Sequence, residues 1–125
     1  MTALATLAGF HRGWAWVVIV GNGLAGLWAL GATQWPPLRT RALWLFTAAV
    51  QLSIFVEVAL GVTMVAGKEV PDLQFHMFYG FIMLVAVGII YSYRQQLRDR
   101  LYLLYGLGGL FVMGLGIRAL QVGPR

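Results

Sequence analysis

Apolar residues fall into four long runs along the chain, separated by short polar or helix-breaking segments. The runs cover about 14–32, 42–65, 73–93 and 101–120. Each approaches or exceeds the roughly 20 residues with which an α-helix crosses the hydrocarbon core of a bilayer. None alternates between apolar and polar residues, as the strands of a membrane barrel do. The pattern therefore predicts an all-α fold, a four-helix transmembrane bundle.

The connections between the predicted helices are short. Pro36 and Pro37 end the first helix, because a proline pair cannot continue one. A polar turn over 67–72 follows the second helix, and a charged segment over 94–100 follows the third. Connections of this length make neighbouring helices antiparallel. Since four spans leave little other chain, we expect a single integral membrane domain over 1–125.

Composition supports lipid as the surrounding solvent. The chain is 60% hydrophobic and only 10% charged, whereas soluble domains have about 25% charged residues. Its net charge of +5 lies at the predicted helix ends, where Lys and Arg anchor a helix to the membrane surface. No basic and aromatic cluster of the kind that binds nucleic acid is present. The lipid bilayer is thus an expected partner, and nucleic acid is not.

The distribution of basic residues gives a prediction of orientation. The two loops 33–41 and 94–100 lie on one side and hold five arginines, while the other side holds Arg12, Lys68, Arg118 and Arg125. Cytoplasmic loops carry the excess of basic residues. The chain is therefore predicted to be a multi-pass protein of the cytoplasmic (inner) membrane with both termini external, and its Ala/Gly/Arg-rich composition is typical of bacterial membrane proteins.

Small residues recur along two of the predicted helices. Gly21, Ala25 and Ala29 follow one another every four residues in the first, and the fourth contains five glycines. Stripes of small residues let membrane helices approach closely. They favour association with a second copy or with a partner membrane subunit.

A polar group inside the second predicted helix is a candidate functional site. Glu57 is the only acidic residue within any span, and Ser53 lies on the same face four residues earlier. Asn22 falls at a similar depth in the first span. Because an isolated carboxylate in hydrocarbon costs at least about 2.5 kcal/mol, we expect a hydrogen bond from Asn22 to Glu57, with Ser53 nearby. This group is either a proton, cation or quinone site or a polar clasp between helices.

The two histidines form a second candidate site. His11 and His76 stand near the starts of the first and third spans, so both lie toward the same membrane face. Two imidazoles at similar depth suit the axial positions of one haem b, with Gly80 leaving room for the macrocycle and Arg12 facing a propionate. The alternative is a histidine hydrogen-bonded to a backbone carbonyl or a headgroup. Glu57 lies deeper, about 13 Å from its helix end, which disfavours a metal shared with the histidines.

No catalytic motif for nucleotide, metalloprotease or serine-hydrolase chemistry occurs in the chain. With no cysteine either, we expect no catalytic residues and no dedicated metal site. The leading hypothesis is a non-enzymatic accessory or self-associating subunit of a membrane complex. The alternatives are a haem- or quinone-binding electron-transfer subunit using His76 and His11, and a proton-coupled transporter or ion-channel oligomer using Glu57.

Overall fold

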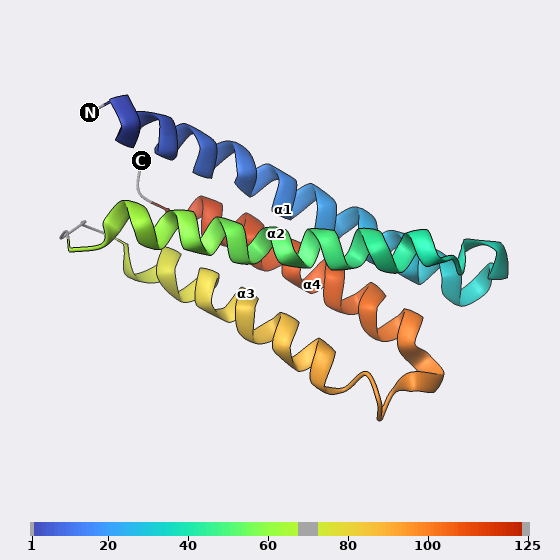
Figure 1. Ribbon diagram of the computed structural model, residues 1–125. Coiled ribbons are helices and arrows are strands. Elements are labelled where there is room, and N and C mark those ends of the chain that lie inside the picture. Colours follow the sequence, from blue (N-terminus) through green and yellow to red (C-terminus); the bar gives the residue numbers. More distant parts are fainter. Residues whose placement is uncertain (1, 68–72, 124–125) are drawn as a thin grey trace.

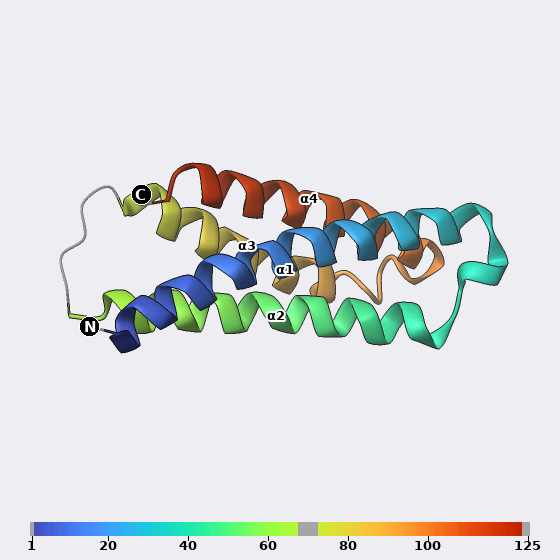
Figure 2. The same ribbon diagram turned by 90° about the horizontal axis from the view of Figure 1, so that it is seen from above.

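The computed structural model describes residues 2–67 and 73–123, and within them four long helices run lengthwise beside one another (Figures 1 and 2). They are α1 (Thr2–Gln34), α2 (Arg41–Val65), α3 (Gln74–Ser92) and α4 (Leu101–Gln121). The described residues contain no strand. All four helices are long and apolar enough to cross a membrane. Successive helices run in opposite directions, so both termini lie at one end of the bundle (Figure 1), which is called the terminal end below.

Three of the four predicted spans agree with the observed helices to within one residue at each end. The first prediction was wrong at its start, because α1 begins at Thr2, 12 residues before Trp14. The only helix-weakening residues in this stretch are Gly9 and Gly13, and membrane helices tolerate glycine. The aromatic residues at Trp14 and Trp16 therefore do not mark a helix end, and His11 lies well inside α1.

Short connections close the other end of the bundle, called the loop end below. A turn of 3-10 helix, η1 (Pro36–Leu38), follows α1, and a second, η2 (Arg98–Arg100), leads directly into α4. Thr40 caps α2, since its hydroxyl oxygen accepts a hydrogen bond from the Leu43 amide at 3.4 Å. At the terminal end, Gly67 takes a left-handed conformation with φ of 72° after α2, but residues 68–72 of the predicted turn lie outside the described residues.

The four helices form a ring with one tight and one loose side. α1 packs most extensively on α4 and α2, α3 packs on α4, and α2 touches α3 only sparsely. All four helices contribute to one buried cluster: Val18, Ile54, Met83, Ala86, Val87, Ile90 and Val112. The outer surface is apolar, with Phe75, Leu45 and Leu52 more than 60% exposed.

Glycines on α1 and α4 bring the two helix backbones into direct contact. A Cβ atom on Gly109 would lie 2.9 Å from the Asn22 carbonyl oxygen and from the Gly26 Cα. A Cβ on Gly26 would lie 2.8 Å from the Gly106 carbonyl oxygen. These neighbours are backbone atoms, which cannot swing aside as a flexible side chain can. Only glycine therefore permits this helix spacing.

The α1–α4 contact can be tested with two alanine substitutions in the same helix. Gly109→Ala should lower the free energy of unfolding by about 1–3 kcal/mol, because its methyl group forces the two backbones apart. Gly114→Ala is the control, since a Cβ there meets nothing within 4 Å. Unfolding of the purified protein in detergent, followed by circular dichroism, measures both effects. Equal stabilities for the two variants would contradict the close backbone contact.

Candidate functional site

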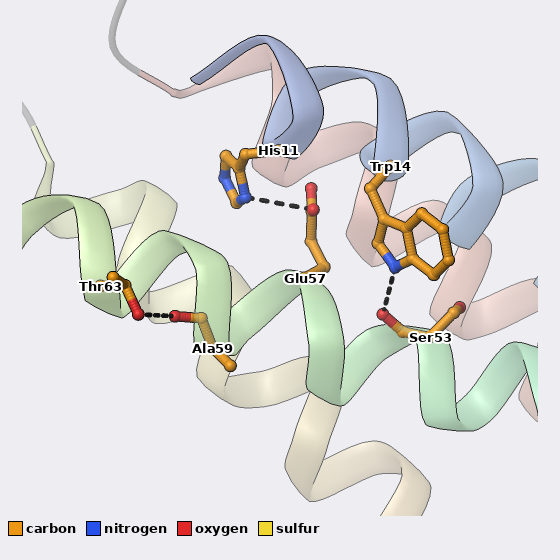
Figure 3. Close-up of polar contacts among 6 residues, drawn as sticks. All are labelled: His11, Trp14, Ser53, Glu57, Ala59 and Thr63. Atoms are coloured by element: carbon orange, nitrogen blue, oxygen red, sulfur yellow. Dashed lines mark hydrogen bonds and ion pairs between the residues drawn. The ribbon is translucent and has the colours of Figure 1, made fainter. Parts of the chain in front are cut away.

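An imidazole and a carboxylate meet between α1 and α2 near the terminal end. His11 Nδ1 lies 3.1 Å from Glu57 Oε1 (Figure 3). Both atoms are buried, and the described residues offer neither of them a hydrogen bond of good geometry. The contact is therefore a close approach of the two groups rather than an aligned hydrogen bond. The Glu57 carboxylate, inside the apolar helix α2, thus has the His11 imidazole as its neighbour.

The start of α1 at Thr2 explains why His11 reaches Glu57. Nine residues separate Thr2 from His11, or about 14 Å along the helix axis, and eight separate Glu57 from Val65 at the end of α2, or about 12 Å. Because α1 and α2 are antiparallel and the start of α1 lies beside the end of α2 (Figure 2), His11 and Glu57 lie at the same depth. The sequence-based estimate placed His11 at a helix end, which separated it from Glu57.

His76 on α3 is held by α4 in a different way. Its Nδ1 lies 2.7 Å from the Ala119 carbonyl oxygen, which belongs to the last turn of α4 and has no amide partner further along the helix. Since a carbonyl oxygen only accepts hydrogen bonds, Nδ1 must donate. In a neutral ring the lone pair then lies on Nε2. At His11 the Glu57 carboxylate stands next to Nδ1, but no aligned hydrogen bond from the described residues fixes the tautomer of this ring.

The two histidine rings lie next to each other in an edge-to-face arrangement. Their centroids lie 6.1 Å apart, with the ring planes at 78°. They come from α1 and α3, which are diagonal in the ring of helices. The structure therefore brings the two predicted candidates, His11 and His76, into one site and adds Glu57 to them.

Each imidazole is flanked by a glycine one turn beyond its acceptor. Gly61 follows Glu57 by four residues, and a Cβ there would lie 3.1 Å from His11 Cε1. Gly123 follows Ala119 by four residues, and a Cβ there would lie 2.9 Å from His76 Nδ1. Sequence reasoning missed both glycines and Ala119. The spacing Glu57–Gly61 was visible in the sequence, but nothing there connected it to a histidine on another helix.

The predicted bond between Asn22 and Glu57 is not formed. The Asn22 amide instead donates to the Val18 carbonyl at 2.8 Å and to the Val50 carbonyl at 3.4 Å. Asn22 is only 1% exposed. Asn22 sits too far toward the loop end, opposite Val50, because the longer α1 shifts the register relative to α2.

Ser53 also belongs to a clasp that fixes α1 against α2. Its hydroxyl donates to the Val50 carbonyl, the same acceptor that Asn22 uses. Its own carbonyl accepts the Trp14 indole N–H at 2.8 Å (Figure 3). In hydrocarbon such bonds between helices are worth about 0.6 kcal/mol each. They hold Glu57, one turn beyond Ser53, at the depth of His11.

The remaining candidates lie apart from the histidine pair. Arg12 is exposed on the surface next to His11. Several small residues predicted to join two chains are used inside this one: Gly21 faces Val50, Gly109 faces Gly26, Gly116 faces Ile19, and Ala25 and Ala29 are buried. Gly80, Gly88 and Gly114 keep open space around them. Along α1 and α4, close helix approach thus serves the fold of the single chain.

The His11–Glu57 contact can be tested with double-mutant cycles. His11→Ala and Glu57→Gln should be non-additive in the free energy of unfolding by at least about 0.5 kcal/mol, because each removes the partner of the other. A cycle of Asn22→Leu with Glu57→Gln should be additive, since these side chains share no contact. Unfolding in detergent measures both cycles. Coupling in the second cycle but not in the first would support the predicted pairing of Asn22 with Glu57 instead of the His11–Glu57 contact.

Comparison with known proteins adds no information on this site. No protein-family model, no curated protein and no solved structure matches the chain.

Proposed function

We propose that this chain is a membrane-spanning electron-transfer subunit that holds one haem b between His11 and His76. The observation that supports the proposal is the pair of imidazoles whose centroids lie 6.1 Å apart, with His76 Nδ1 bonded to the Ala119 carbonyl and His11 Nδ1 next to the Glu57 carboxylate. The Nε2 atoms of both rings would be the ligands. The four long apolar helices and their apolar outer surface support a position in the bilayer.

The spacing of the rings suits two ligands on opposite sides of one metal. Metal–nitrogen bonds to histidine are about 2.0–2.1 Å long, and a ring nitrogen lies about 1.1 Å from its ring centroid. Two imidazoles in line with a metal therefore have centroids about 6 Å apart. The observed centroid distance of 6.1 Å is close to this value.

A haem suits the site better than a bare ion. Zinc takes three or four protein ligands, and the described residues bring together no group of three His, Cys, Asp or Glu that could hold a metal. A haem needs few protein ligands because the porphyrin binds its own iron, and His11 and His76 would hold it. The haem iron would supply one-electron chemistry.

A macrocycle would have to enter on the loose side of the ring. α2 touches α3 only sparsely, and a Cβ at Gly80, one turn from His76, would meet nothing within 4 Å. Arg12 is exposed beside His11 and suits a propionate as a charged partner. Larger residues at Gly61 or Gly80 would narrow this space.

The residues behind the rings act as positioning groups. The Ala119 carbonyl orients His76, and the Glu57 carboxylate stands next to Nδ1 of His11. Partners of this kind fix the ring orientation of metal-binding histidines and raise the basicity of the ligand. Glu57 thereby acquires a role at the histidine site, which favours electron transfer over an independent ion pathway.

The haem proposal predicts a Soret band in the protein purified from membranes or incubated with haemin. His11→Ala and His76→Ala should each abolish the band or weaken it at least tenfold, since each removes one axial ligand. Met77→Ala is the matched control, because Met77 neighbours His76 but is 53% exposed. Absorption spectroscopy at equal protein concentration measures all four proteins.

Loss of the band through misfolding is separated from loss of a ligand by rescue with imidazole. Added imidazole should restore the spectrum of His76→Ala, because the free ligand fills the space that the side chain left. A native protein that takes up no haem, or histidine variants that retain the full band, would contradict the proposal.

A further inference from the structure

The loop end of the bundle contains a cavity of about 310 Å³ that takes no part in the histidine site. It lies between the end of α1 and the connection from α3 to α4. Its lining includes two cations, Arg39 and Arg100, one anion, Asp99, and the apolar or aromatic side chains of Leu103 and Tyr102. A cavity with both charges on its wall suits a ligand that also carries both.

Arg39 is held in place before any ligand arrives. Its Nε donates to the Ala32 carbonyl at 2.7 Å and its Nη2 to the Thr33 carbonyl at 3.2 Å, at the end of α1. The guanidinium carbon lies 5.3 Å from the Tyr102 ring centroid. A guanidinium has five N–H donors, so three remain for an anion. Because the side chain is already ordered, binding would cost little conformational entropy.

Aromatic residues gather at the end of the bundle that holds this cavity. Trp28, Trp35, Trp44 and Tyr102 gather near the loop end, and Trp28 donates to the Leu38 carbonyl at 3.1 Å. Trp and Tyr are enriched at the membrane–water interface. Phospholipid headgroups are therefore the molecules that surround the cavity.

Asp99 limits which lipid headgroups match the charges of the cavity. No salt bridge joins it to a basic residue in the part of the chain that the structure describes, although Arg39 and Arg100 line the same cavity. Its carboxylate remains available to a cation. We propose that the cavity binds the headgroup of phosphatidylethanolamine, with the phosphate at Arg39 and Arg100 and the primary ammonium at Asp99.

Other common headgroups match the cavity less well. The choline group of phosphatidylcholine has no N–H to donate to Asp99. Phosphatidylglycerol offers no cation, so its phosphate would meet the arginines while Asp99 stayed unpaired. The primary ammonium therefore distinguishes the three lipids.

Lipid binding to the purified full-length protein in detergent tests this inference by native mass spectrometry. Three lipids with identical acyl chains serve as probes: phosphatidylethanolamine, phosphatidylglycerol and phosphatidylcholine. Phosphatidylethanolamine should bind about fivefold more tightly than phosphatidylcholine, the size of one exposed ion pair. Asp99→Asn should remove this preference.

Variants of the arginines test the phosphate contact. Arg100→Gln should weaken binding of all three lipids about fivefold, and Arg39→Gln should do the same. Arg98→Gln is the control, because it lies in the same loop with the same charge but does not line the cavity. Arg39 also donates hydrogen bonds to the end of α1, so its variant could fail to fold. In that case the Arg100→Gln variant alone tests the phosphate contact.

Two results would overturn the inference. One is equal affinity for phosphatidylethanolamine and phosphatidylcholine. The other is a preference for phosphatidylglycerol that Asp99→Asn leaves unchanged, because the cavity would then bind phosphate alone. Neither result bears on the haem proposal, whose residues lie at the terminal end.

Discussion

The backbone contact between α1 and α4 determines the shape of this protein. Gly26 and Gly109 let the first and last helices approach so closely that no other residue fits. This contact closes four consecutive helices into a ring. The opposite side, between α2 and α3, has no comparable seam and stays loose. Because α1 and α3 are diagonal in such a ring, side chains from both reach its interior from opposite directions. The meeting of His11 and His76 depends on this closure.

The two halves of the histidine site repeat one local arrangement with different chemistry. In each half, a histidine contacts an oxygen atom on the next helix. A glycine follows the residue that carries this oxygen by four positions and also lies against the imidazole. On α2 the acceptor is the Glu57 carboxylate, and at the end of α4 it is the Ala119 carbonyl. The Ala119 carbonyl fixes the orientation of the His76 ring, and the two glycines leave space for the rings. The carboxylate brings a charge that hydrocarbon disfavours, so His11 and Glu57 each lessen the cost of burying the other.

Much of the fold could be predicted from the sequence, because hydrophobic runs in a bilayer have few alternatives. Three helices agree with their predicted spans to within one residue. The start of α1 could not be predicted, since no proline or charge before His11 marks a boundary. That single error changed the site: it placed His11 at the surface and paired Glu57 with Asn22. A polar side chain inside the bundle pairs with whichever polar group lies at the same depth on a neighbouring helix. That depth is counted from the helix end, and hydropathy does not define where a helix ends.

The depth of the histidine site bears on how the proposed haem would exchange electrons. Glu57 lies about 12 Å from the terminal end of α2, whereas the hydrocarbon core is about 30 Å thick. The site is therefore much closer to the terminal end than to the loop end. The tightly packed cluster around Ile54 and Val112 lies between the site and the loop end. A single haem at this depth would be accessible to a carrier at the terminal face and remote from the other face. The proposed function thus requires a partner at the terminal end, while the arginines and aromatic residues of the loop end anchor the bundle.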